Sequence, residues 1–412
     1  MDAREGVLLA LRQIRAQKLK SFFAVLGVVI GVMFLITVVS VIEGMNRYME
    51  EDFARTVFGL NTITVSRTPE ISFAGPEVWR EWARRPRLTM EDAEAIRERL
   101  EVPALVAVES HSGGELEAED GTEVENVWLT GASADYFRIR EFAVEKGRLF
   151  TGLEDRLGVP VVVLGYEAAD RLFGRLDPLG RTVKVNGFPF RVIGVLKKQG
   201  TLFGMSLDNR AIAPARSQLG RTINPHNVVD NILIRTTDDQ AMARAQIEIE
   251  AIMRVRHRLR PTDADDFAIE TAEDSMAFWA KISQILYMAF PSLVGIALVV
   301  GGMVIMNIML VSVMERTREI GMRKAVGARR RDIIMQVLVE SATLSGSGAA
   351  VGIIIGIALA QIVRAISPLP AAIAPQWLAV SVLLGAGVGI AAGIYPAARA
   401  ARLDPVVALR AE

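Results

Sequence analysis

The sequence predicts a membrane protein with four transmembrane α-helices and a large mixed α/β extracytoplasmic domain between helices 1 and 2. The mean hydropathy is +0.31 although 23% of the 412 residues are charged, which indicates that apolar and charged residues are segregated along the chain. The formal net charge is +0, which excludes a basic nucleic-acid-binding protein. The chain has no cysteine, which excludes disulfides, thiolate metal sites and thiol catalysis.

Four uncharged runs are the predicted spans, and they cover residues 22–42, 282–314, 341–363 and 365–398. Pro368, Pro370 and Pro375 confine the last helix to about residues 376–395. A helix needs about 20 apolar residues to cross a hydrocarbon core of about 30 Å, and each predicted helix reaches that length. The first run is longer than the apolar region of a signal peptide and no A-x-A-like site follows it, so we expect an uncleaved anchor.

The positions of Lys and Arg predict the orientation. Basic residues crowd the N-terminal flank, the segment between the second and third runs, and the C-terminal tail, whereas the loop SPLPAAIAP has none. Because cytoplasmic flanks are enriched in Lys and Arg, both termini are predicted to be cytoplasmic and the long segment after the first run to lie outside, in the periplasm or extracellular space. The predicted division is 1–20 a cytoplasmic amphipathic helix, 21–43 helix 1, 44–281 the outside α/β domain, 282–314 helix 2 with a stalk, 315–332 a charged cytoplasmic loop, 333–364 helix 3, 365–375 a short outside loop, 376–397 helix 4, and 398–412 the cytoplasmic tail.

The outside domain shows strand and helix signals in alternation. Residues 61–66, 159–164, 182–185, 190–196 and 267–271 are predicted strands, and residues 89–100 and 237–259 are predicted helices. Residues 115–130 predict two strands joined at Asp120-Gly121, and Asn186-Gly187 predicts a second hairpin turn. Thr89 is the predicted N-cap of the first helix. In the tail, Asp404-Pro405 predicts the start of a short helix over residues 406–410.

No catalytic or metal-binding residue is predicted in this domain. His111, His226 and His257 are the only histidines, and they lack the spacing of metal ligands. The acidic run that begins at Glu115 could bind calcium, but strand alternation places its first three carboxylates on one solvated face. The segment GRLDPLGRT departs from a phosphate-binding loop in its glycine spacing and in having Arg in place of Lys.

Several segments resemble one known family. Residues 307–328 read NIMLVSVMERTREIGMRKAVGA, residues 394–410 read IYPAARAARLDPVVALR, and residues 11–32 read LRQIRAQKLKSFFAVLGVVIGV. With LFGRLDPLGRTVKVNGFPFRVIGVLKKQG in the outside domain, they resemble the MacB/FtsX-type (type VII) permeases of ABC transporters along the whole chain. The resemblance implies a MacB-like periplasmic core domain. It also implies a permease without a fused ATPase domain, because only residues 1–20 precede the first span and no Walker motif occurs.

The resemblance implies a permease subunit that is not itself an enzyme and holds no cofactor, with ATP and Mg bound by a separate ATPase subunit. Long helices would carry motion to the periplasmic domains, a process called mechanotransmission, for export of a substrate such as a peptide, antibiotic or lipid-linked molecule. The implied partners are the ATPase subunit, a second copy of the permease as a homodimer, the lipid bilayer and, in an organism with two membranes, a periplasmic adaptor and an outer-membrane channel. Two alternatives share the scaffold, namely FtsX-like activation of a cell-wall hydrolase and lipoprotein release.

The resemblance implies that the protein lies in the inner (cytoplasmic) membrane and that the charged loop is the coupling helix of this family. A helix from residue 315 to about residue 326 would place Arg316, Glu319 and Arg323 along one face, where they could dock into a groove on the ATPase. The residues that the resemblance assigns to coupling are Glu315, Arg316, Thr317, Arg318, Glu319, Ile320, Gly321, Arg323, Lys324 and Gly327.

Small residues and one acid within the spans are further candidates. Glycines recur every four residues in the third and fourth runs, at Gly348, Gly352, Gly356, Gly385, Gly389 and Gly393. Such spacing lets backbones approach closely, so we expect spans three and four to pack tightly. Glu340 is either an intramembrane acid, which is a functional candidate, or an interfacial residue. Residues 282–314 would extend about 50 Å as a helix, beyond a hydrocarbon core of about 30 Å, and the surplus predicts a stalk.

Overall fold

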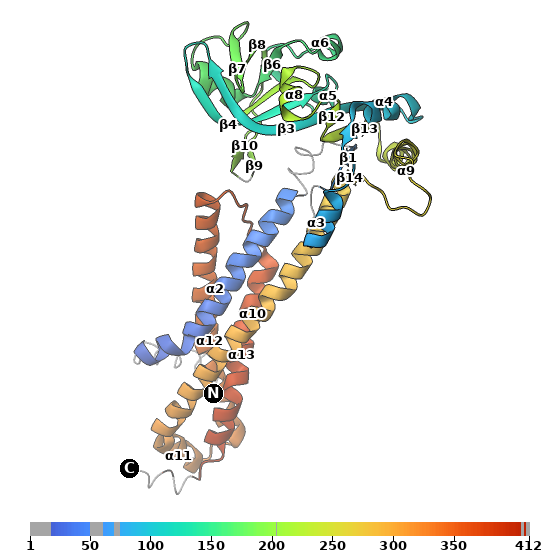
Figure 1. Ribbon diagram of the computed structural model, residues 1–412. Helices are drawn as coiled ribbons and strands as arrows, with labels where there is room; N and C mark the ends of the chain where they lie inside the picture. The colour runs from blue at the N-terminus through green and yellow to red at the C-terminus, as the bar shows by residue number, and fades with distance from the viewer. Residues whose placement is uncertain (1–17, 50–60, 70–74, 203, 405–407, 409–412) are drawn as a thin grey trace. The chain divides into compact units, whose positions relative to one another are not determined.

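The computed structural model describes residues 18–49, 61–69, 75–202, 204–404 and 408 (Figure 1). The chain divides into a helical unit, Met1–Tyr48 with Ala280–Glu412, and an α/β domain, Met49–Trp279, and each is described by itself. The predicted fold class is confirmed, because four long apolar helices are present and a mixed α/β domain lies between the first and the second. The predicted N-terminal amphipathic helix and the predicted helix at residues 406–410 lie almost entirely outside the described residues.

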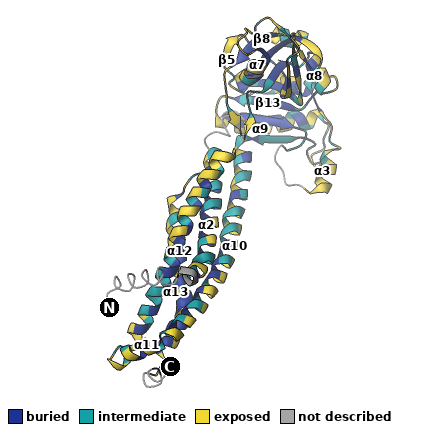
Figure 2. Cartoon of the chain, turned by 90° about the vertical axis from the view of Figure 1, so that its left-hand side faces the viewer, coloured by how far each residue is buried: buried dark blue, intermediate teal, exposed yellow. Residues whose placement is uncertain are grey.

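The helical unit consists mainly of long hydrophobic helices whose outer faces are apolar. Its elements are α2 (Lys18–Tyr48), α10 (Ala272–Glu315), α11 (Thr317–Ala325), α12 (Arg330–Ile366) and α13 (Pro375–Ala401). All of them except α11 are long and apolar enough to cross a membrane. Large side chains such as Ile296, Ile354 and Leu383 are 64%, 68% and 72% exposed (Figure 2). Such continuous exposed apolar surface is typical of helices that face lipid.

The α/β domain is built on a 10-stranded sheet. Its strands are β1 (Thr62–Ser66), β3 (Ala104–Ala118), β4 (Glu123–Ala132), β5 (Val144–Gly147), β6 (Val161–Leu164), β7 (Thr182–Val185), β8 (Phe188–Leu196), β11 (Arg210–Pro214), β13 (Asn231–Thr236) and β14 (Ala268–Thr271). Two short pairs lie apart from it, β2 (Leu88–Thr89) with β12 (Val228–Val229) and β9 (Thr201–Leu202) with β10 (Met205–Ser206). The helices are α3 (Pro76–Trp82), α4 (Met90–Arg99), α5 (Tyr136–Ile139), α6 (Gly152–Leu157), α7 (Tyr166–Phe173), α8 (Gln218–Ile223) and α9 (Asp239–Arg256).

Part of the sheet closes on itself. The strand order is β14-β1-β13-β3-β4-β11-β6-β8-β5, and β7 pairs with both β3 and β8. Strands β3, β4, β11, β6, β8 and β7 therefore form a closed ring, which removes exposed strand edges. Apolar side chains such as Leu116, Val162 and Phe190 are buried together in one cluster contributed by these strands.

The rest of the sheet is open and is covered by two helices. The N-terminal half of β3 pairs with β13, which pairs with β1, which pairs with β14, and each of these pairs is antiparallel. Residues of α4 and α9, including Ile96 and Ile249, pack on this part in a second cluster. The register of β3 with β4 shifts between Gly114 and Leu116, at the point where β3 passes from one part to the other. The single long strand thus belongs to both cores.

The predicted hairpins are present, but strands β5, β11 and β13 of the main sheet and the four strands of the two short pairs were not predicted. Asn186 and Gly187 join β7 to β8 with positive φ values of 47° and 83°, as a type I′ turn requires. Thr89 caps α4 in a reciprocal capping box with Asp92. Strands β11 and β13 were missed because they are buried on both faces and therefore lack the alternation of a half-buried strand.

Candidate functional site

The charged loop after α10 folds as a separate short helix. The sequence predicts one helix from residue 315, but Arg316 leaves the helical conformation with φ −106° and ψ 17°, and α11 begins at Thr317. The Thr317 hydroxyl donates to the Met314 carbonyl at 2.8 Å and closes the end of α10. Gly327 follows α11 with φ +104°, a conformation that favours glycine and ends the helix. The coupling motif is therefore a helix with a defined start and stop.

Three of the predicted coupling residues face α12. The guanidinium of Arg316 lies 3.3 Å from the carboxylate of Glu340. Arg323 donates to Gln336 at 2.6 Å and to Glu319 at 2.6 Å. All five side chains line one small cavity beside α12. Arg316, Glu319 and Arg323 do share a face, and this face is turned toward the third long helix.

The opposite end of α11 is held by the end of α13. The Lys324 ammonium donates to the Ala401 carbonyl at 3.0 Å and also to that of Leu403. Gly321 packs so closely that a Cβ there would lie 2.6 Å from Cβ of Ala408. Ile320 is buried in the helical core. These contacts leave Arg318, Met322 and Val326 on the exposed side of α11.

Glu340 has a cationic partner. Its side chain is 16% exposed and its carboxylate pairs with Arg316. Gln336 lies one helical turn before it and receives the hydrogen bond from Arg323. Gln336 was not identified from the sequence, although its i, i+4 spacing to Glu340 places both on one face of α12 and was the available signal.

The glycines of α12 face α2. A Cβ on Gly348 would lie 3.0 Å from Cβ of Val25, and one on Gly352 would lie 2.8 Å from the Val29 carbonyl oxygen. Gly356 is equally close to Met33. The hydroxyl of Thr37 also donates to the Gly356 carbonyl at 3.3 Å. This stripe therefore joins the first and third long helices.

The glycines of α13 face α12. A Cβ on Gly389 would lie 2.5 Å from the Ser341 carbonyl oxygen, and Gly385 and Gly393 pack on the same face of α12. Ser345 donates its hydroxyl hydrogen to the Gly385 carbonyl at 2.6 Å. The expected close packing of spans three and four is thus made by the glycines of span four against small residues of span three.

The α/β domain carries charged networks but no arrangement typical of catalysis. Within its described residues, no group of three or more His, Asp or Glu side chains could hold a metal ion. Glu117 pairs with Lys184 at 2.8 Å, so the acidic run on β3 is partly neutralised across the sheet. Buried Glu109 pairs with Arg140 at 2.9 Å. Burial favours the protonated form of Glu109, yet Arg140 and His111 hold its pKa well below its usual range.

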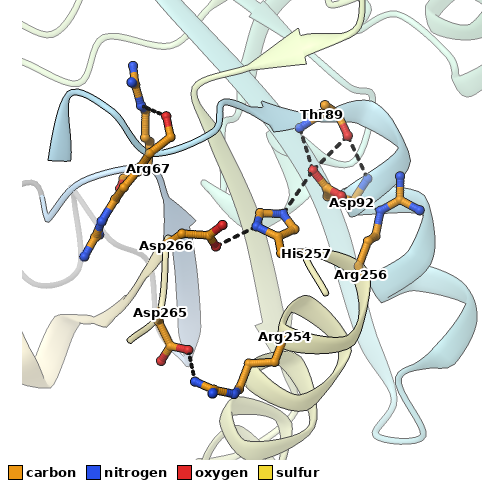
Figure 3. A network of polar contacts seen from close by, with 9 residues as sticks. Arg67, Thr89, Asp92, Arg254, Arg256, His257, Asp265 and Asp266 are labelled. Carbon is orange, nitrogen blue, oxygen red and sulfur yellow. Dashed lines mark hydrogen bonds and ion pairs between the residues drawn. The ribbon is translucent and has the colours of Figure 1, made fainter. Parts of the chain in front are cut away.

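A second charged network joins α4 to the end of α9 (Figure 3). His257 lies between two carboxylates, with Nδ1 at 2.6 Å from Asp266 and Nε2 at 3.8 Å from Asp92. Arg256 also pairs with Asp92. The nearby carboxylate of Asp92, together with that of Asp266, raises the pKa of His257, although burial alone would lower it. No nucleophile lies beside this histidine in the drawn network. The carboxylates of Asp92 and Asp266 instead connect α4, α9 and the segment before β14.

Two family models match the chain. The model of the MacB-like periplasmic core domain matches residues 21–252, and the model of the FtsX-like permease C-terminal region matches residues 291–405. The chain is similar to the macrolide export ATP-binding/permease protein MacB of Bdellovibrio bacteriovorus, with 32% identity over 401 residues. This match covers 96% of the chain but 60% of that relative, so the chain spans about 60% of its length.

A second relative matches end to end. The ABC transporter permease YknZ of Bacillus subtilis is 32% identical over 416 residues, which cover 100% of each chain. Among solved structures, the periplasmic region of MacB from Actinobacillus actinomycetemcomitans is 22% identical, with a TM-score of 0.44, and covers 58% of this chain and 97% of that one.

Proposed function

We propose the following function from the premise that this chain belongs to the family of MacB/FtsX-like ABC transporter permeases with a MacB-like periplasmic core domain. The chain couples ATP hydrolysis in a separate ATPase subunit to motion of that domain. The observation that carries the proposal is the attachment of α11. One side of this helix is fastened to α12 and α13 by charged hydrogen bonds, and the other side is exposed. A partner bound to the exposed side can therefore move two long helices at once.

The proposed path of force starts at the exposed residues of α11. Arg318, Met322 and Val326 would contact the ATPase, and Met322 and Val326 are 53% and 91% exposed. Displacement of α11 would pull on α12 through the pair of Arg316 with Glu340 and through the hydrogen bond of Arg323 with Gln336. Hydrogen bonds to charged groups contribute about 1.5–3 kcal/mol each, enough to transmit such a displacement.

The glycine contacts would make the long helices move together. The stripes on α12 and α13 bring α2, α12 and α13 into backbone contact, and packed interiors transmit strain because they are poorly compressible. α10 follows β14 without interruption and at 44 residues is about 66 Å long. This supports transmission of motion along the helix and needs no substrate path through the membrane.

The proposed work is export of a substrate from the outer side of the inner membrane by two copies of the chain with two ATPase subunits, both termini being cytoplasmic. The match of residues 21–252 to a MacB-like core domain favours export over FtsX-like hydrolase activation, whose outside domain is typically smaller. The MacB relatives are described as macrolide exporters, so a macrolide such as erythromycin is the first substrate to test. In an organism with two membranes, a periplasmic adaptor and an outer-membrane channel are the expected partners.

The coupling proposal can be tested without a known substrate. The chain has no cysteine, so a single Glu123→Cys substitution on the α/β domain gives one spin label per copy. In lipid nanodiscs with the cognate ATPase, we expect the distance between the labels of two copies to change on addition of ATP and vanadate. Glu319 pairs with Arg323 at 2.6 Å, and Glu319→Lys replaces this ion pair by two like charges. The substitution should abolish the distance change while ATPase binding is retained.

The matched control is Asp170→Lys, a charge reversal at an exposed residue of α7 that should leave the distance change intact. An unaltered distance change in Glu319→Lys would contradict the role assigned to α11.

A further inference from the structure

A partly open cavity lies in the α/β domain, between the apolar cluster under α4 and α9 and a third apolar cluster beside α5. Its volume is about 350 Å³, at the lower end of the range of about 300–1,000 Å³ typical of small-molecule pockets. Ala93 and Val108 of its apolar wall belong to the first of these clusters, and Ala134 packs against the second. α4 and α6 contribute most of the charged lining, namely Glu94, Arg97, Asp155 and Arg156, to which Asp135 and Arg216 from two loops are added.

Three acidic and three basic side chains line the cavity, and only some of them are paired with one another. Glu94 pairs with Arg216 at 2.6 Å, and Asp135 pairs with Arg138 at 3.5 Å, outside the cavity. Arg97 uses one nitrogen to bond the Val106 carbonyl at 2.7 Å, which leaves its other donors available. Arg156 forms no hydrogen bond or ion pair with any residue that the structure describes. The cavity therefore presents two arginines with unused donors.

Asp155 is the unusual member of this lining. Its Oδ1 atom is buried and accepts no hydrogen bond from the described part of the chain. Burial raises the pKa of Asp155 to about 6, although the backbone of Ala134 and the charges of Arg216 and Arg97 act in the opposite direction. A carboxylate whose pKa is raised by burial lowers the stability of the fold at neutral pH, and groups with strongly shifted pKa values are concentrated at functional sites.

The walls of the cavity are rigid on the side of Asp155. Thr151 and Glu154 form a reciprocal capping box that starts α6, and Arg148 holds Glu154 with two hydrogen bonds of 2.7 and 2.8 Å. Gly158 ends the helix with φ +62° and lies so near Arg216 that a Cβ would be 2.5 Å from its carbonyl oxygen. The Asp155 carboxylate is thus presented by a short helix that is fixed at both ends.

We propose that this cavity binds a small zwitterion of amino-acid or dipeptide size, whose ammonium group is received by Asp155 and whose carboxylate is received by Arg97 and Arg156. Oδ1 itself is buried, but Asp155 is only partly buried and lines the cavity, so its carboxylate can accept hydrogen bonds from the ammonium through Oδ2. Two arginine forks match the geometry of a carboxylate, and the alanines with Val108 admit an apolar side chain. The site does not depend on the coupling function of α11, because every residue in it belongs to the α/β domain.

The test is calorimetric titration of the full chain in detergent with L-leucine and with L-alanyl-L-leucine. We expect saturable binding of at least one of them. The N-acetyl form lacks the ammonium and the amide form lacks the carboxylate, so each should bind at least about tenfold more weakly. Equal binding of the three forms, or no saturable binding of either zwitterion, would overturn the proposal.

Two substitutions locate the site. Asp155→Asn keeps side-chain size and removes the charge, and Arg156→Gln replaces the guanidinium by a shorter neutral amide; each should weaken binding of the zwitterion at least about tenfold. The matched controls are Asp170→Asn and Arg175→Gln, exposed residues of α7 and of the loop after it, which should bind as the unaltered chain does. Unchanged affinity in Asp155→Asn, in a protein whose thermal unfolding shows that it is folded, would refute the assignment of the ammonium position.

Discussion

The two units of this chain differ in their closest contacts and in their surfaces. In the helical unit the closest contacts between helices are made at glycines, and a Cβ on Gly27 would lie 2.6 Å from Cα of Gly301. In the α/β domain aromatic side chains occupy the centre, and Phe137 and Phe190 are each 1% exposed. The helical unit also buries large side chains such as Leu35, but it exposes many others, such as Leu383, on its surface.

The difference follows from the two solvents. In water, burial of apolar area stabilises a fold by roughly 25 cal/mol per Å², so the biggest apolar side chains contribute most when buried. In lipid this driving force between helices is absent, and association depends on close van der Waals contact and on hydrogen bonds between helices. Large apolar side chains are therefore buried in the domain that faces water, whereas in the helices that face lipid they can remain on the surface at little cost.

The largest effect that this comparison predicts is in the α/β domain. Phe190→Ala should lower the local free energy of unfolding by about 3–5 kcal/mol, because it removes an aromatic side chain from the closed ring of strands. Hydrogen exchange of β8 peptides in the full chain measures the loss. Phe188→Ala is the matched control, since Phe188 is 37% exposed and its loss should change exchange little. Equal effects of the two substitutions would break the comparison.

A second prediction concerns a carboxylate that opposes the packing of the same domain. Asp155→Asn should stabilise the domain above pH 6 by on the order of 3 kcal/mol, because burial raises the pKa of Asp155 from 3.8 to about 6. Below about pH 4 the carboxyl is protonated in both states and the gain disappears. Between these limits the unfolded state ionises first, so the unaltered domain loses stability as the pH rises. Thermal unfolding of both proteins at pH 4 and pH 7.5 measures this; a gain that does not vary with pH would contradict it.

The smallest effect is predicted in the helical unit. Gly389→Ala should destabilise the packing of α13 on α12 by about 1–3 kcal/mol, because the new methyl group overlaps the backbone of Ser341. Gly387→Ala is the matched control, since no atom lies within 4 Å of its Cβ position. The control should be neutral or slightly stabilising, because alanine favours helix over glycine. The apparent unfolding temperature in detergent distinguishes the two, and equal shifts would show that the stripe does not pack the helices.

Local chemistry made much of this fold predictable. The long uncharged runs predicted the four apolar helices because a bilayer requires such length. Asn186-Gly187 predicted its hairpin because the turn needs two residues with positive φ, and Thr89 predicted the start of α4 because its hydroxyl can cap a free N–H. Each of these signals is complete within a few neighbouring residues.

Partners that are distant in sequence were not predictable in this way. The glycine spacing showed that α12 and α13 carry close-packing stripes, but not that Gly352 faces α2 while Gly389 faces α12. Glu340 was a candidate acid from the sequence, and only the fold placed Arg316 beside it. A stripe of glycines or a buried charge indicates the type of contact that the residue makes, but not which segment of the chain provides it.

The sequence by itself determined the solvent of each region, the number of apolar helices, the local turns and caps, and the family. Periodicity, length and composition are properties of neighbouring residues, so they can be read from the sequence before the tertiary structure is known. The tertiary structure decided the closure of the strand ring, the attachment of α11 to two other helices, and the cavity that brings Arg97, Asp155 and Arg156 together. These features depend on which distant segments lie side by side, which is settled by the packing of the whole domain.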